Sequence, residues 1–220
     1  MKALQDCYLY GIVDLGYASP DEAPGITREM LAGGVDIIQI RAKRELAPVI
    51  VALAEQIAPV CRDYGAPLIV NDYPWLVSRC DAAGCHLGQD DGPLASARTK
   101  AGPDSLVGRS THSLAQARAA RDEGADYLGF GPIFATPTKP DYDAIGLADV
   151  SQAHREVADR PIFCIGGIKL ENLERVLAAG AKRVVVVSGL LQSPDVAGYA
   201  KSCRALLGSE STVDGRRSTA

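Results

Sequence analysis

The chain has 220 residues, of which 47% are hydrophobic and 23% are charged, and its 23 basic and 27 acidic side chains leave a net charge of −4. A charged fraction near the globular average of about 25% excludes wholesale disorder. The slight acidic excess argues against a dedicated nucleic-acid or membrane-surface protein, which would carry a basic stripe, but it leaves room for a small anionic ligand.

Eight apolar runs predict eight β-strands. In chain order they cover residues 8–14, 36–41, 67–72, 84–88, 105–111, 127–134, 161–166 and 183–188. Four of these runs follow a glycine that ends an amphipathic segment, namely Gly34, Gly65, Gly124 and Gly180. Such a glycine is typical of a helix C-terminus, and the β-branched run after it suits a buried strand. The alternation of helices and strands predicts βα units and a parallel sheet.

Several helices between these strands carry signals of their own. Pro59 lies inside an amphipathic stretch and predicts a kink there. Ser113 and Gln116 match a capping box at the start of a helix. Ser193, followed by Pro194, predicts the N-cap and first turn of the last helix.

Eight strands are the number that closes a (β/α)8 barrel, a fold of roughly 200–250 residues. The competing architecture, a doubly wound open sheet, would carry a glycine-rich dinucleotide loop after its first strand. No GxGxxG motif follows Asp14. We therefore predict an α/β protein with a single (β/α)8 TIM barrel over residues 1–207 and a disordered polar tail over residues 208–220.

The cysteines and the N-terminus bear on location. The six cysteines include no CxxC pair, and Cys164 stands in an apolar run, which predicts buried reduced thiols rather than zinc ligands or disulfides. No segment approaches the roughly 20 apolar residues that span a bilayer. Residues 1–6 hold no apolar signal core, so we expect a cytoplasmic protein.

Polar residues follow nearly all of the predicted strands, at the end of a barrel where active sites are built. Arg41 and Lys43 are two residues apart, so an extended segment points both to one side, and Lys139 follows a Thr-x-Thr loop. These three cations favour a polyanionic ligand over ordinary surface charge. Gly166 and Gly167 after the seventh strand and Ser188 after the eighth predict a phosphate site, the alternative being a tight turn.

Two aspartates, Asp72 and Asp91, end the adjacent third and fourth strands. Two facing carboxylates repel each other unless a cation lies between them, and Mg²⁺ prefers such oxygen ligands. The alternatives are a turn role for Asp72 and helix capping for Asp91.

The three histidines indicate no proton-transfer site. We expect His154 to be exposed on a helix and His86 to point outward from its strand, while His112 bonds a neighbour or the substrate. Neither a Ser-His-Asp order nor HExxH spacing is present. The site is better equipped to bind and stabilise anions than to move protons.

Seven segments at strand ends are together highly specific: YLYGIVD (8–14), GGVDIIQIRAK (33–43), LIVND (68–72), HLGQDD (86–91), GRSTH (108–112), GFGPIFATPTK (129–139) and IGGI (165–168). From residue 8 to about residue 191, the chain resembles the thiamine phosphate synthase (thiamine-phosphate pyrophosphorylase) family. The resemblance implies a transferase that joins 4-amino-2-methyl-5-pyrimidinylmethyl diphosphate to hydroxyethylthiazole phosphate. Its products would be thiamine monophosphate and pyrophosphate.

The resemblance also implies roles for single residues. Those implied for the pyrimidine diphosphate are Gln39, Arg41, Lys43, Asn71, Ser110 and Lys139, of which Arg41, Lys43, Ser110 and Lys139 form the catalytic set. Those implied for the thiazole phosphate are Thr136, Pro137, Thr138, Gly167, Val187 and Ser188. Ile40 and Ala42 complete the substrate-binding set. Asp72 and Asp91 would hold Mg²⁺ on the diphosphate.

Two positions depart from the family pattern. Arg109 stands where an apolar residue is frequent, and Asp90 stands where glutamate is common, which leaves Asp91 rather than Asp90 as the expected metal ligand. The rival functions are a thiazole tautomerase of the same superfamily and a non-catalytic regulator that binds thiamine precursors. A tautomerase has no need for all the charged groups above, and a regulator releases no pyrophosphate. We expect small-molecule substrates, no nucleic-acid or membrane partner, and, as in many relatives, a homodimer.

Overall fold

All eight predicted strands form in the computed structural model, which describes residues 1–136 and 143–209. They are β1 (Leu9–Asp14), β2 (Ile37–Arg41), β3 (Leu68–Asn71), β4 (Gly84–Leu87), β5 (Leu106–Thr111), β6 (Tyr127–Phe130), β7 (Ile162–Cys164) and β8 (Val184–Val186). Each strand pairs in parallel with the next, and β8 pairs with β1, so the sheet closes on itself. The predicted (β/α)8 barrel is confirmed.

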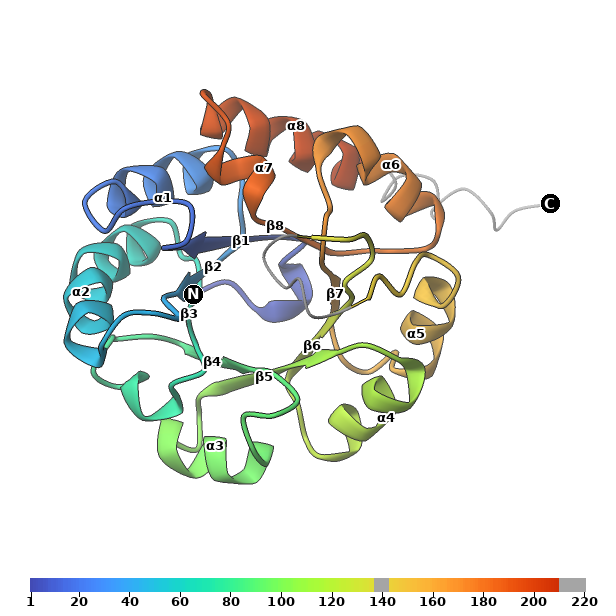
Figure 1. The fold of residues 1–220 in the computed structure, drawn as a ribbon, viewed down its shortest axis with the longest axis horizontal. Coiled ribbons are helices and arrows are strands. Elements are labelled where there is room, and N and C mark those ends of the chain that lie inside the picture. The colour runs from blue at the N-terminus through green and yellow to red at the C-terminus, as the bar shows by residue number, and fades with distance from the viewer. Residues whose placement is uncertain (137–142, 210–220) are drawn as a thin grey trace.

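Helices form a ring outside this barrel (Figure 1). They are α1 (Ala23–Ala32), α2 (Ala47–Asp63), α3 (Leu94–Ala101), α4 (Leu114–Asp122), α5 (Val150–Glu156), α6 (Leu170–Ala178), α7 (Ser188–Leu191) and α8 (Val196–Ser209). The connection from β3 to β4 holds only the 3₁₀ turn η2 (Pro74–Leu76). Helix α8 thus runs two residues past the predicted domain end at 207, and residues 210–220 of the predicted tail lie outside the described residues.

The hydrophobic core has two parts. An outer layer fills the space between strands and helices, and an inner cluster fills the barrel around Tyr10, Tyr127 and Phe163. The N-terminal 3₁₀ turn η1 (Leu4–Asp6) lies across the end where the strands begin, and its Leu4 joins the inner cluster (Figure 1). The interior is therefore closed at that end, which leaves the carboxyl ends of the strands for a site.

The local signals were mostly correct. The four glycines predicted at helix ends all have positive φ, from 66° to 98°: Gly34, Gly65, Gly124 and Gly180. Helix α2 continues through Pro59. Ser113 accepts the N–H of Gln116 as predicted, but the Gln116 side chain accepts the N–H of His112 instead of completing the capping box.

The predicted start of the last helix at Ser193 is wrong. Helix α8 begins at Val196, and the Asp195 carboxylate accepts the Gly198 N–H at 2.8 Å. Asp195 is therefore the N-cap, since it satisfies a backbone donor that has no partner within the helix. Ser193 accepts the Asp195 N–H at 3.1 Å and shapes the turn before the helix.

The predicted exposure of His154 on α5 is also wrong. Its Nε2 atom is buried and has no hydrogen-bond partner in the part of the chain that the structure describes. Burial, together with the positive charges of Lys182 and Arg183, lowers the pKa of His154 to about 4. The imidazole is therefore held neutral in the folded protein.

This neutral histidine predicts a loss of stability in mild acid. The usual pKa of 6.5 applies in the unfolded chain, so between pH 6.5 and about 4 the unfolded state binds a proton that folded His154 does not. His154→Leu should remove about 2 kcal/mol of the fall in unfolding free energy between pH 7 and pH 5. Urea unfolding of both proteins at pH 7 and pH 5 measures this difference in unfolding free energy. An equal fall in variant and wild type would contradict the role of His154.

The six cysteines are free and buried, as predicted. Burial is the main cause that raises the pKa of Cys164 to about 12, so this thiol is inert at neutral pH. Within residues 1–136 and 143–209, no helix is both long enough and apolar enough to cross a membrane.

Candidate active site

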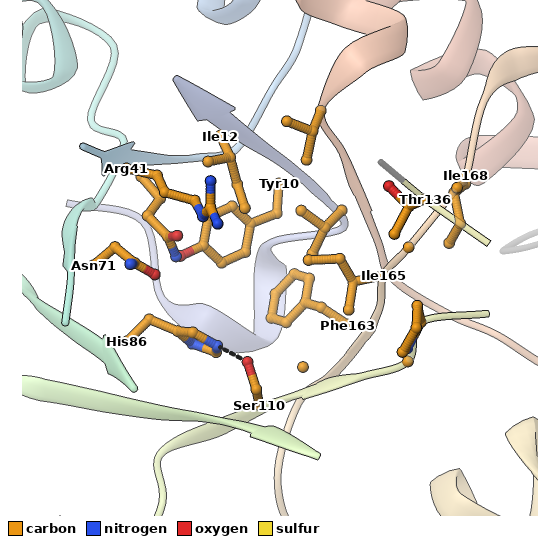
Figure 2. A pocket seen from close by; sticks show the side chains of 18 of the residues that line it. Tyr10, Ile12, Arg41, Asn71, His86, Ser110, Thr136, Phe163, Ile165 and Ile168 are labelled. Carbon is orange, nitrogen blue, oxygen red and sulfur yellow. Dashed lines mark hydrogen bonds between the residues drawn. The ribbon is translucent and has the colours of Figure 1, made fainter. Parts of the chain in front are cut away.

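A pocket opens at the carboxyl ends of the strands and is lined by side chains that alternate inward along them (Figure 2). Figure 2 shows Arg41, Asn71 and Ser110 pointing into a common space. Its polar lining consists of Gln39, Arg41, Asn71, His86, Ser110, Thr111, His112, Thr136 and Ser188. Polar groups from most of the strands therefore converge on one cavity.

The predicted site residues fall into four groups. Those that line the pocket are Gln39, Arg41, Asn71, Ser110, Thr136, Gly167, Val187 and Ser188. The side chains of Ile40 and Ala42 lie in the outer hydrophobic layer, so only their backbone groups could take part in binding. Pro137, Thr138 and Lys139 lie outside the described residues. Lys43, Asp72 and Asp91 follow strands β2 to β4 at the rim.

Arg41 is held by an ion pair that the sequence did not indicate. Its Nη1 lies 2.5 Å from Oδ2 of Asp14, the last residue of β1, whose side chain is buried. Asp14 also accepts the N–H of Gly16. The carboxylate therefore fixes the guanidinium in the pocket wall, and it offsets part of the Arg41 charge.

Lys43 and Asp72 form the second ion pair, with Nζ and Oδ2 2.5 Å apart. Asp72 has φ 65°, a left-handed conformation that aspartate tolerates better than most residues. Burial raises the pKa of its carboxyl group and Lys43 lowers it, while the charge and a hydrogen bond of Asp91 raise it further. The two carboxyl groups are thus close enough to interact, as their positions on adjacent strands predicted.

Asp91 has a defined local role. Its Oδ2 accepts the Gly88 N–H at 2.6 Å, which closes the loop between β4 and α3. Helix capping does not account for it, because α3 has Pro93 at its N-cap and no side-chain cap. Asp90 and Asp91 are both exposed, but it is Asp91 that acts on Asp72.

A buried chain of hydrogen bonds crosses the pocket floor. Gln39 Nε2 donates to Tyr10 Oη at 2.7 Å, and Tyr10 Oη lies 3.2 Å from Tyr127 Oη. Tyr127 Oη lies 3.2 Å from His86 Nδ1, and His86 Nε2 lies 2.9 Å from Ser110 Oγ (Figure 2). The chain links Gln39 to Ser110, two residues predicted to bind substrate, and fixes both side chains.

The predicted outward orientation of His86 is wrong, since its ring points into the barrel. Strand β4 has four residues, too few alternations between inward and outward side chains to predict which way His86 points. The glycine at position 108 was the sequence feature that could have indicated an inward His86 ring. A Cβ there would lie 2.2 Å from Tyr127 Cζ and 2.6 Å from His86 Nδ1, so glycine makes room for both rings.

We expect Tyr127→Phe to lower the unfolding free energy by about 1–3 kcal/mol, because the buried His86 Nδ1 and Tyr10 hydroxyl lose a partner. The ring itself stays packed edge-on against Phe163. Tyr64→Phe is the matched control, since that ring is 48% exposed. Denaturant unfolding compares the two. A Tyr127→Phe protein as stable as the control would show that the chain contributes nothing to stability.

The glycine pair after β7 has a packing role. Gly166 and Gly167 have φ of 99° and 62°, and a Cβ at Gly167 would lie 2.7 Å from the Cβ of Phe134. The Phe134 N–H donates to the Gly166 carbonyl at 3.0 Å. The glycines therefore make a turn and let the loop after β6 pack against it, which brings Thr136 and Ser188 into the same pocket wall.

Comparison with known proteins identifies the family. A model of the family described as thiamine monophosphate synthase matches residues 9–190. The chain belongs to the thiamine monophosphate synthase family. Thiamine-phosphate synthase from Thermus thermophilus is 46% identical over 179 residues, which are 81% of this chain and 85% of that protein. The one from Acidothermus cellulolyticus is 44% identical over 199 residues, 90% of this chain and 93% of the relative.

A solved structure agrees with membership of the thiamine monophosphate synthase family. Thiamine phosphate pyrophosphorylase from Pyrococcus furiosus superposes with a TM-score of 0.84 at 30% identity, covering 94% of this chain and 98% of that one. The resemblance inferred from the seven sequence segments is thus confirmed, and so is the activity class it implied, a thiamine-phosphate synthase of thiamine biosynthesis.

Proposed function

We propose that this thiamine-phosphate synthase (EC 2.5.1.3) transfers the pyrimidinylmethyl group from its diphosphate to the thiazole nitrogen by a dissociative route. One observation carries the proposal. The ion pairs Arg41–Asp14 and Lys43–Asp72, with Asp91 beside them, gather at the pocket end of strands β1 to β4. A diphosphate leaving group needs such a concentration of cations and metal-binding carboxylates.

Asp72 and Asp91 fit a magnesium ion. Burial raises the pKa of the Asp72 carboxyl group and the nearby Asp91 carboxylate raises it further, and a divalent cation between the two groups would relieve that repulsion. Mg²⁺ bound by Asp72 and Asp91 would neutralise charge that develops on the departing diphosphate.

Lys43 and Arg41 serve the same leaving group as hydrogen-bond donors. The Lys43 ammonium lies at the edge of the carboxylate pair, and the Arg41 guanidinium is already oriented by Asp14, so neither needs to reorganise as negative charge grows. Diphosphate departs as a stable anion and the electron-rich aminopyrimidine stabilises the methylene cation. No general base is required, which suits a site without a catalytic triad.

The pocket floor would hold one substrate and the far wall the other, so that the two reacting groups face each other. Gln39, Asn71 and Ser110 offer donors and acceptors to an aminopyrimidine, and the hydrogen-bond chain keeps Gln39 and Ser110 in place. Thr136, Gly167, Val187 and Ser188 on the other wall would bind the thiazole phosphate, together with Pro137 and Thr138. Holding both substrates in one cavity supplies the orientation for attack by the thiazole nitrogen.

Pyrophosphate release tests this function. Purified protein is incubated with the pyrimidine diphosphate, the thiazole phosphate and Mg²⁺, and pyrophosphate and thiamine monophosphate are measured together. We expect both to form in equal amounts and only when both substrates are present. Thiazole isomerisation without pyrophosphate would indicate a tautomerase, and binding without turnover would indicate a regulator. The cytoplasmic location and the homodimer stay predictions.

A further inference from the structure

The loop that carries Asp91 is held at both ends by one buried arginine. This loop, residues 88–92, connects β4 to α3. Arg109 on β5 donates through Nη1 to the Gly88 carbonyl and through Nη2 to the Gly92 carbonyl at 2.6 Å. Its side chain is 6% exposed, and its nearest acidic group, on Glu123, is 3.8 Å away and mostly in solvent. The guanidinium therefore depends chiefly on the two loop carbonyls.

Gly88 connects this arginine directly to the Asp91 carboxylate. Its carbonyl accepts from Arg109, while its N–H donates to Asp91 Oδ2 at 2.6 Å. Gln89 in the same loop donates to the backbone carbonyl of Ser110 at 2.6 Å, so the loop is tied to β5 by a second contact. The N–H and the carbonyl belong to adjacent peptide groups joined at the Gly88 Cα, so movement of the Gly88 backbone would move the carboxylate that it holds.

The geometry requires an arginine rather than any cation. A planar guanidinium can donate to two carbonyls in fixed directions, whereas an ammonium is a point charge that spans them poorly. A buried charge is costly unless it is well hydrogen-bonded, so the guanidinium and the loop carbonyls stabilise one arrangement. Arg109 does not line the pocket, because Ser110, the next residue on β5, faces it instead.

We propose that Arg109 is a positioning residue that fixes the Asp91 carboxylate for metal binding by clamping residues 88–92. The inference rests on the proposed function, in which Asp91 holds Mg²⁺. Arg109 lies outside the pocket lining, and it acts through the Gly88 backbone.

Amide hydrogen exchange in metal-free protein tests the clamp without any reaction. We expect the Gly88 amide to exchange at least about tenfold faster in Arg109→Met than in wild type, with amides in the barrel strands unchanged. Arg98→Met is the matched control. Arg98 is a partly buried arginine that donates to the Ser105 and Gly124 carbonyls away from this loop, so its loss should leave Gly88 exchange unaltered.

The magnesium requirement tests the consequence. The Mg²⁺ concentration for half-maximal pyrophosphate release should rise about 10-fold in Arg109→Met and less in Arg109→Lys, while KM for the thiazole phosphate stays at its wild-type value. Wild-type exchange at Gly88, or an unchanged Mg²⁺ requirement, overturns the proposal. If Arg109→Met does not fold, Arg109→Lys carries both measurements. An Asp91→Asn protein with an unchanged Mg²⁺ requirement would instead refute the proposed metal site, and the positioning role with it, whatever the exchange shows.

Discussion

Lys43→Ala should lower kcat by about 10²-fold at saturating substrates, because it removes a preorganised donor from the leaving group. The effect should fall on kcat, since charge grows on the diphosphate only as the C–O bond breaks. Steady-state pyrophosphate release at saturating substrates measures the loss of kcat.

The control for this variant is its neighbour in the chain. Arg44 is exposed, and Arg44→Ala removes the same unit of charge one residue away. We expect Arg44→Ala to keep nearly wild-type kcat, which separates a local contact from a change in net charge. Similar losses in both variants would contradict a specific role for Lys43.

Asp72→Asn and Asp91→Asn are each expected to raise the Mg²⁺ concentration for half-maximal activity and to lower kcat. The two effects together should reduce the activity of each variant by about 10²-fold. Asparagine is a sound test at position 72 because it keeps the shape of the side chain and tolerates φ of 65°. Each amide removes one negative metal ligand and also the repulsion between the pair. Magnesium titrations of pyrophosphate release give the measurement.

Asp90→Asn is the matched control, since Asp90 is the neighbour of Asp91 in the chain and is exposed as Asp91 is. It should titrate with Mg²⁺ as wild type does. If Asp90→Asn were the variant with the altered requirement, the ligand would be Asp90 and the assignment made from the sequence would be wrong. Unchanged titrations in the Asp72 and Asp91 variants would leave both aspartates with a structural role only.

Most of the fold could be predicted from local patterns. The barrel followed from eight apolar runs and from glycines at helix ends, because those features depend on backbone conformation. Strand β6 shows where such patterns fail, since it ends at Phe130 and not at residue 134. A Cβ on Gly131 would lie 2.0 Å from the Ile165 carbonyl oxygen, so contact with the β7 segment sets the end of the strand. Such a tertiary contact leaves no periodic trace in the sequence.

The charged residues of the candidate site could be predicted from the sequence. Lys43, Asp72 and Asp91 stand out because polar residues after buried strands meet at one end of a barrel. Tyr10 and Tyr127 could not be found this way, since the partners of their hydroxyl groups depend on which strands face each other across the interior. The resemblance to the family pattern marked Arg109 as a departure, and its contacts with the 88–92 loop suggest the positioning role proposed above.

The bridging-oxygen isotope effect tests most directly whether this pocket works by easing diphosphate departure. The measurement compares ¹⁶O and ¹⁸O between the pyrimidinylmethyl carbon and the diphosphate, in wild type and in Lys43→Ala. We predict a normal effect in the variant, at least as large as in wild type, because C–O cleavage then limits the rate. An effect of unity in Lys43→Ala would mean that the slowed step is not bond cleavage, and would contradict leaving-group stabilisation by these residues.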